Sequence, residues 1–230
     1  MKMTLRALSA LLGYPSSELK AAIPEIREAI AAEAALPRPA RRRLEPLLER
    51  LASGDLLDLQ AEYTELFDRG RSLSLHLFEH VHGESRERGP AMIDLAEQYM
   101  QAGYLLDDPE LPDFVPVFVE FASCLAPEDA REHLSQPAHV FAALEERLAE
   151  RRSDYAAIFG ALIAAAKARP DREALAELKA NAPDDDPALI DEEWEEKEVT
   201  FTATHDMGGP TGIVARIRAK GKALSAARKA

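Results

Sequence analysis

The sequence has only one cysteine, Cys124, in 230 residues, so no disulfide can form within the chain. Its 11 glycines form no GxGxxG or Walker pattern to bind phosphate, and no GxSxG motif presents a nucleophilic serine. No apolar run approaches the roughly 18 residues of a membrane span. Arg6 interrupts the first apolar stretch, which also lacks the cleavage site of a signal peptide. We therefore expect a soluble, cytoplasmic protein that is not an enzyme.

Basic residues are in the minority: 28 Lys and Arg face 41 Asp and Glu, for a net charge of −13. This argues against a nucleic-acid partner, because phosphate contacts need a basic surface. Residues 184–198 hold nine acidic residues and one lysine, whereas residues 214–230 hold six basic residues and no acidic one. We expect one helical domain over residues 1–182, and then a flexible, largely irregular tail over residues 183–230, acidic first and basic afterwards.

The repeat of apolar residues at intervals of three and four predicts an all-α fold, a single-domain helical bundle. Breakers and caps delimit the predicted helices, which cover residues 4–13, 16–34, 40–52, 55–70, 72–83, 85–103, 113–126, 127–134, 137–152 and 153–168. We expect Thr4, Ser16 and Asp55 to cap helix N-termini and Gly83 to end a helix. Cys124, within an apolar helix, is expected to be a buried and inert thiol.

The segment LHLFEHVHGESRERG, residues 75–89, concentrates histidine and charge. His76 and His80 would share one face of a helix, a spacing that can chelate zinc, but no HExxH or CxxC motif supplies further ligands. The competing interpretation is that the imidazoles form hydrogen bonds within the bundle, or lie near a helix C-terminus. We expect no metal and no cofactor, and keep a histidine-based metal-binding protein as the less favoured alternative.

Two blocks are distinctive, YTELFDRGRSLSLHLFEHVHGESRERGPAM at residues 63–92 and ELPDFVPVFVEFAS at residues 110–123. With LLGYP at residues 11–15 and DEEWEEKEVTF at residues 191–201, they resemble the nitrate reductase assembly chaperones. These are the NarJ-type branch of the TorD/DmsD family of redox-enzyme maturation proteins. The resemblance covers most of residues 5–201. The chain departs from the family's LPDH element, because Phe114 stands where histidine usually follows the aspartate.

The resemblance implies an all-helical, cytoplasmic chaperone. Such a protein binds the N-terminal segment of the catalytic (alpha) subunit of a membrane-bound respiratory nitrate reductase. It supports insertion of the bis-molybdopterin guanine dinucleotide cofactor into that subunit and delays membrane attachment until insertion is complete. No nucleic acid, membrane insertion or cofactor of its own is implied, and we expect a monomer. The client could instead be a sulfoxide or amine-oxide reductase, but the FDRGR and LFEHVHGESR blocks favour the nitrate branch.

A peptide-binding chaperone needs a groove of aromatic and aliphatic side chains, and an acidic body attracts a basic peptide. We expect the groove and its charged rim among Tyr63, Phe67, Asp68, Leu77, Phe78, Glu79, His80, His82, Arg86, Arg88, Asp113, Phe114, Phe118 and Phe121. For each apolar candidate, a place in the core of the bundle is the competing interpretation. The charged residues could equally form salt bridges on the turn between two helices.

Overall fold

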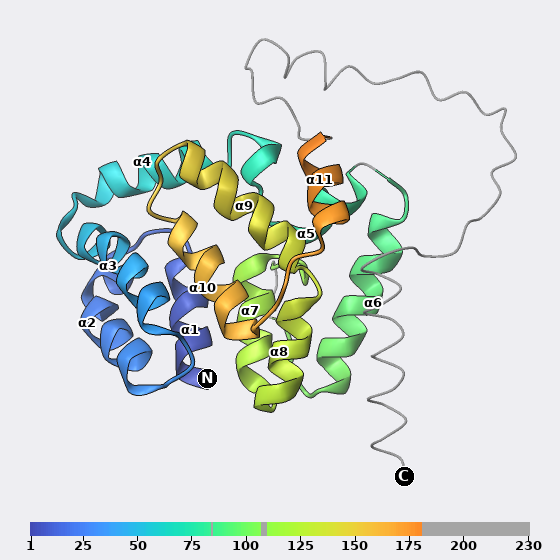
Figure 1. Ribbon diagram of the computed structural model, residues 1–230, viewed down its shortest axis with the longest axis horizontal. Helices are drawn as coiled ribbons and strands as arrows, with labels where there is room; N and C mark the ends of the chain where they lie inside the picture. Colours follow the sequence, from blue (N-terminus) through green and yellow to red (C-terminus); the bar gives the residue numbers. More distant parts are fainter. Residues whose placement is uncertain (84, 107–109, 181–230) are drawn as a thin grey trace, which may run out of the picture.

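The computed structural model describes residues 1–83, 85–106 and 110–180, which form an all-helical fold (Figure 1). The helices in these ranges are α1 (Lys2–Leu11), α2 (Ser17–Ala32), α3 (Arg38–Ser53), α4 (Leu56–Phe67), the 3-10 helix η1 (Arg71–Leu73), α5 (Leu77–His82), α6 (Arg88–Gln101), α7 (Val115–Cys124), α8 (Pro127–Ser135), α9 (Ala138–Glu150), α10 (Ala156–Ala166) and α11 (Arg172–Ala180). The predicted all-α class is confirmed. The predicted tail over residues 183–230 lies outside the described residues.

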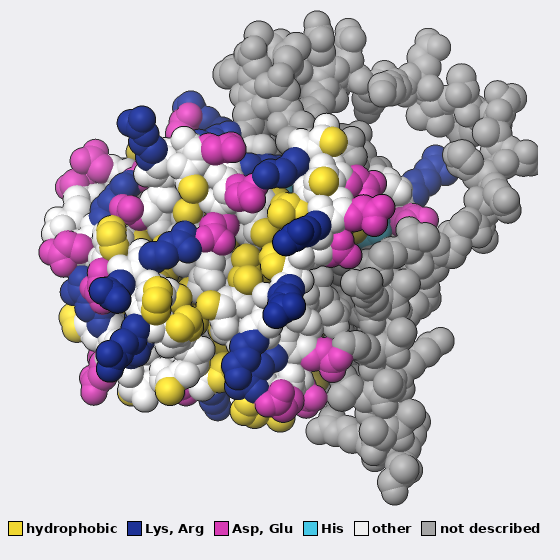
Figure 2. All heavy atoms as spheres, viewed as in Figure 1, with side chains coloured by type: hydrophobic (Ala, Val, Ile, Leu, Met, Phe, Trp, Pro, Cys, Tyr) yellow, Lys and Arg dark blue, Asp and Glu magenta, His cyan; other side chains and the backbone are white. Residues whose placement is uncertain are grey.

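The core forms around three apolar helices, α1, α7 and α10. Helix α1 packs along α7 and α2, and α10 packs against α9, α3 and α8 (Figure 1). The hydroxyl of Ser9 joins α1 to α7 by donating to the carbonyl oxygen of Pro116 at 2.7 Å. On the face in view in Figure 2, acidic and basic side chains are interspersed. Among the described residues, no helix has both the length and the apolar character needed to cross a membrane.

Local capping explains where several helices begin and end. Ser16 accepts a hydrogen bond from the backbone N–H of Leu19 at 3.1 Å, and Asp55 caps α4 through the backbone N–H groups of residues 57 and 58. Gly83 follows α5 with a φ of +52°. These three predictions are confirmed. The prediction for Thr4 is wrong, because α1 begins at Lys2 and the carboxylate of Glu33 accepts both the N–H and the hydroxyl of Thr4.

The predicted continuous helix over residues 72–83 is also wrong. After η1 the backbone is extended, and it pairs with the segment that precedes α7. Val115 N–H donates to Leu75 O at 2.8 Å, and Leu77 N–H donates to Asp113 O at 3.0 Å. The Ser74 hydroxyl accepts the N–H of His76 at 3.2 Å, a local bond that competes with helix formation. Helix α5 therefore starts only at Leu77.

Helix α11 was not predicted; its nine residues mix alanine and leucine with four charged side chains, and none of them is fully buried. Asp171 caps this helix by accepting the N–H groups of Glu173 and Ala174. The guanidinium of Arg147 holds the helix against α9: it donates to Leu178 O at 2.8 Å and to Ser72 O at 2.7 Å. Through Arg147, the last described helix is therefore joined to η1.

Candidate peptide-binding site

A cavity of about 560 Å³ opens where α1, α4 and α7 meet the extended segment after η1. Four of the predicted site residues, Tyr63, Phe67, Asp68 and Phe114, line it. We call it the acidic cavity, and its lining residues are Ser9, Ala10, Gly13, Tyr14, Tyr63, Phe67, Asp68, Leu75, His76, Glu110, Phe114, Pro116, Val117 and Glu120. Its volume is within the range of sites that bind small molecules or a few peptide side chains.

The floor of the acidic cavity is aromatic. Tyr63 and Phe67, one turn apart on α4, have ring centroids 4.8 Å from each other, and Tyr14 contacts Tyr63 edge to face at 5.5 Å. The Tyr63 hydroxyl donates to Leu12 O at 2.8 Å, and burial raises its pKa, so it stays a neutral donor. Tyr14 is 53% exposed and is the part of this floor most open to a ligand.

The rim of the acidic cavity carries carboxylates from three different segments. Asp68 follows α4, Glu110 precedes α7 and Glu120 lies on α7. None of the three takes part in an ion pair with another described residue, and no lysine or arginine is among the lining residues. Glu120 also interacts with the Tyr104 hydroxyl. A ligand with basic side chains would still find three carboxylates that form no ion pair with a described lysine or arginine.

Asp113 fixes the wall of the acidic cavity without lining it. Its side chain is fully buried; one carboxylate oxygen accepts the Phe78 N–H at 3.1 Å, and the other lies 3.2 Å from Nδ1 of His76. The His76 ring in turn stacks at an angle on Phe114, with centroids 5.3 Å apart. Asp113 thus holds the start of α5 and the His76–Phe114 wall together. The Phe114 ring gives this wall an apolar side chain.

The remaining histidines and charges of the distinctive block lie on α5, on the turn that follows it and at the start of α6. Glu79 pairs with Arg88 at 3.1 Å. The Nε2 atom of His80 lies 2.7 Å from Ser74 O, and Nδ1 of His82 is 4.0 Å from the carboxylate of Glu87. Burial lowers the pKa of both histidines, which favours their neutral forms. The Glu79–Arg88 pair, His80 and His82 do not line the acidic cavity.

The expected shared face of His76 and His80 does not exist, because His76 precedes α5 and only His80 is helical. The described ranges contain no group of three His, Cys, Asp or Glu side chains placed to hold a metal ion. Arg86 is exposed on the same turn and outside the cavity.

The other apolar candidates lie in the core. Leu77 and Phe78, on α5, are buried. Phe118 and Phe121 are fully buried on the inner face of α7, where the ring of Phe118 stacks on that of His133 with centroids 3.8 Å apart. They support the site from behind and offer no surface to a ligand. On α7, the residues that do reach the cavity are Pro116, Val117 and Glu120.

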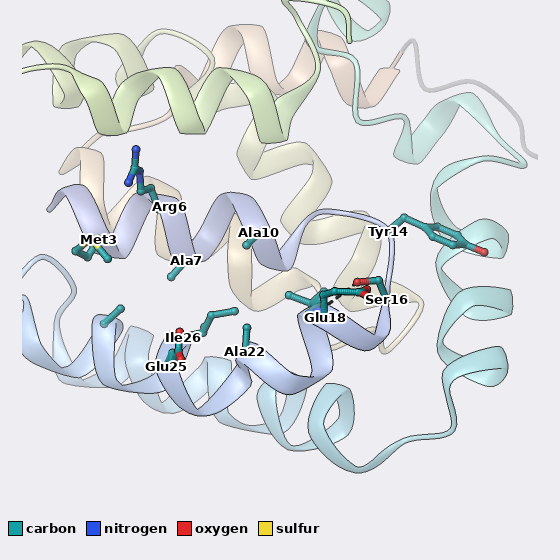
Figure 3. Close-up of a pocket in the computed structure, with 12 residues that line it drawn as sticks. Met3, Arg6, Ala7, Ala10, Tyr14, Ser16, Glu18, Ala22, Glu25 and Ile26 are labelled. Carbon is teal, nitrogen blue, oxygen red and sulfur yellow. Dashed lines mark hydrogen bonds between the residues drawn. The ribbon is translucent and has the colours of Figure 1, made fainter. Parts of the chain in front are cut away.

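A second hollow, the α1–α2 furrow, has a volume of about 510 Å³ (Figure 3). Ala7 and Ala10 on α1 face Ala22 and Ile26 on α2, so small side chains leave room between the helices. The furrow shares Ala10 and Tyr14 with the acidic cavity, and the two hollows meet at these residues. Tyr14 extends from the loop after α1, away from the furrow (Figure 3).

Sequence reasoning missed the contribution of α1 and of two of the three rim carboxylates, Glu110 and Glu120. Tyr14 stands in the LLGYP motif, one of the segments that carry the family resemblance. Glu110 and Glu120 lie within the ELPDFVPVFVEFAS block that also contains Asp113. Glu120 is three residues from Val117 and two from Phe118, so the helical period could have separated the outer face of α7 from the inner one.

Comparisons with known proteins place this architecture in a family. Residues 16–161 match the family described as nitrate reductase delta subunit. The chain is 45% identical to the nitrate reductase molybdenum cofactor assembly chaperone NarJ of Escherichia coli (strain K12), over 87% of this chain and 86% of that protein. It is 41% identical to the probable chaperone NarW of the same strain, over 70% of this chain and 71% of the relative.

A more distant relative is the probable nitrate reductase molybdenum cofactor assembly chaperone NarJ of Bacillus subtilis (strain 168), 33% identical over 71% of this chain and 88% of that protein. The family match over residues 16–161 includes α4 and α7, two of the three helices that build the acidic cavity. The chain belongs to the NarJ family of nitrate reductase molybdenum cofactor assembly chaperones, a family that is not catalytic.

Proposed function

We propose that this protein is the assembly chaperone of a respiratory nitrate reductase and binds the N-terminal segment of the catalytic subunit in the acidic cavity. The apolar side chains of that segment would pack on Tyr14, Tyr63 and Phe67, and its basic side chains would pair with the carboxylates of the rim. Binding would keep the apoenzyme open to molybdenum cofactor insertion and delay its attachment to the membrane.

One observation carries the proposal: an aromatic floor lies beneath three carboxylates that have no cationic partner among the described residues. An aromatic and aliphatic groove is how a folded domain binds one face of an amphipathic peptide. The acidic rim adds orientation and a faster encounter with a basic peptide. Membership of the NarJ family supports the identity of the client.

The first test changes the rim. Asp68→Asn combined with Glu120→Gln is expected to weaken binding of a peptide from the first 30 or so client residues by about fivefold to thirtyfold at low salt, since two charge contacts are lost. Isothermal titration calorimetry at two salt concentrations measures this, with one peptide bound per chain. The salt dependence is expected to become shallower in the same variant.

The matched control is Glu97→Gln combined with Glu150→Gln, which removes two exposed carboxylates outside both hollows. It is expected to change affinity by less than about twofold, because exposed charges distant from the ligand are screened. An equal loss in both double variants would mean that only overall charge matters. Absence of any binding heat with the unaltered chain would reject the proposal.

The floor supplies a separate prediction. Tyr14→Ser is expected to weaken the peptide about tenfold, because an exposed aromatic anchor is typical of the residues that dominate binding energy. Leu57→Ser is the control, since Leu57 is 74% exposed and lines neither hollow. Circular dichroism should show the same helix content in both variants, and equal affinities would place the peptide away from Tyr14.

A further inference from the structure

The chain carries a segment with the chemistry that the acidic cavity would select. Residues 213–224, IVARIRAKGKAL, contain four basic residues and no acidic one. Ile213, Ile217 and Leu224 recur at intervals of four and seven, the spacing at which a peptide presents one apolar stripe to a groove. We call residues 213–224 the basic segment. It offers apolar and cationic groups together, as the acidic cavity requires.

The place where the described chain ends favours this match. Arg147 joins Leu178 O to Ser72 O, and Leu75, three residues after Ser72, lines the acidic cavity. The described chain therefore ends near η1, which leads within a few residues into one wall of the cavity. A random-coil chain of the 32 residues between Ala180 and the basic segment has a root-mean-square span of roughly 30 Å. A tether of that order gives an effective concentration near the millimolar range, so even weak contacts are populated.

We propose that the basic segment occupies the acidic cavity of its own chain when no client peptide is present, and that the client must displace it. Displacement by a client peptide rests on the proposed function, whereas docking of the basic segment in the acidic cavity does not. Such an arrangement would cover the aromatic floor in the free chaperone and would set a threshold against peptides that match the site poorly.

The chain also contains a competing acidic partner, residues 184–198, which hold nine acidic residues and one lysine. That stretch could pair with the basic segment through charge alone. The acidic cavity adds an apolar floor, and so it can bind the isoleucines as well as the arginines. The two possibilities predict different effects of substitutions in the cavity, which makes them separable.

Cys124 provides a natural probe. It ends α7 one turn after Glu120 and, contrary to the expectation of a buried thiol, it is exposed. Because it is the single cysteine of the chain, a nitroxide can be attached there in the full-length protein without other changes. The label would sit beside the acidic cavity and broaden the amide signals of whichever residues come close to it.

The expected result is strong broadening of the amide signals of residues 213–224 at low salt and much weaker broadening of residues 202–208. Arg216→Gln combined with Arg218→Gln and Lys220→Gln should abolish the difference. The control Arg228→Gln combined with Lys229→Gln lies outside the basic segment and should retain most of it.

Substitutions in the cavity decide between the partners. Asp68→Asn combined with Glu120→Gln should remove the broadening if the segment docks in the acidic cavity. Broadening that survives this change but is lost when residues 191–196 are neutralised would assign the segment to the acidic stretch and overturn the proposal. Absence of broadening in the unaltered chain would overturn it as well. So would broadening seen only between a labelled chain and a second, isotope-labelled chain.

Displacement is measured by calorimetry with the client peptide. The triple variant of the basic segment is expected to bind that peptide about threefold to tenfold more tightly, because no internal competitor has to leave. If the basic segment docks but the triple variant binds the client peptide no more tightly than the unaltered chain, the client does not displace the segment, and that part of the proposal is overturned. If the peptide binds neither form, the proposed function fails, and the relaxation measurement alone still decides whether the segment docks.

Discussion

Replacing Asp113 with alanine is expected to lower the free energy of unfolding by about 3–5 kcal/mol, the range typical of removing one partner from a buried, hydrogen-bonded charge. The Asp113 carboxylate is fully buried and holds two groups from another segment, the Phe78 N–H at 3.1 Å and Nδ1 of His76 at 3.2 Å. Alanine would leave the N–H buried without its acceptor, and each unsatisfied buried group is costly. Urea unfolding followed by circular dichroism measures the loss.

Asp113→Asn separates shape from charge at this position. The amide retains one oxygen acceptor, which can still serve the Phe78 N–H or His76 but not both at full strength, so we expect about half the loss seen with alanine. Glu110→Gln, three residues earlier on the rim of the cavity, is the control and should leave stability nearly unchanged. A loss below about 1 kcal/mol for Asp113→Ala would show that the backbone pairing of residues 75–77 with 113–115 holds the segment without the carboxylate.

The Asp113 variants also connect stability with peptide binding. Two backbone hydrogen bonds join residues 75–77 to residues 113–115. Leu75, His76 and Phe114, on these two segments, line the acidic cavity. Loosening this junction should move one wall of the cavity away from its floor. The Asp113→Asn variant, which is expected to stay folded, should therefore bind the client peptide more weakly even though Asp113 itself does not reach the cavity.

Most helices could be predicted because the signals that define them are local. A capping side chain at Ser16 or Asp55 acts within three residues, and the positive φ at Gly83 depends on the glycine itself. Helix α11 was missed although it too has local signals, the cap at Asp171 and the pair Leu175 and Leu178 at helical spacing. It is short and packs only partly buried side chains against the rest of the fold.

The errors arise where a segment's partners are distant in sequence. Residues 72–77, SLSLHL, alternate polar and apolar side chains with the period of a strand, which the helix prediction overlooked. The segment with which this stretch pairs lies almost forty residues away, and the pairing removes the helical spacing between His76 and His80. Thr4 has the chemistry of a cap, but Glu33 from the end of α2 already satisfies the first turn of α1. No local rule contains these contacts.

The candidate site was predicted only in part for the same reason. Tyr63, Phe67, Asp68 and Phe114 line the acidic cavity, but an aromatic residue in an amphipathic helix can face inward or outward. Phe118 and Phe121 face the core, where they surround the buried ring of His133. Which side of α7 is open follows from the packing of α8 on the other side, and this packing is a property of the assembled fold.

His133 leads to the second large effect, a loss of stability in mild acid. Its ring, 3% exposed, stacks on Phe118, and burial lowers its pKa to about 3. In the unfolded chain the same imidazole titrates near its ordinary value of about 6.5. Below that pH the unfolded state takes up a proton that the folded state does not, so the stability present above pH 6.5 falls as the pH drops toward 3.

This single group is expected to remove about 2 kcal/mol of the unfolding free energy between pH 7 and pH 5. His133→Phe and His133→Leu cannot bind the proton, so each should show a shallower fall over this interval, whatever its stability at pH 7. Leu134→Val, a core change next to His133 on α8, should lower the whole curve without altering its slope. Urea unfolding at pH 7, 6 and 5 measures the slopes. Parallel curves for the His133 variants and the unaltered chain would mean that the ring takes up its proton over the same pH range in the folded and unfolded states. The protonated ring would then have to be accommodated among Phe118, Phe121 and Tyr99.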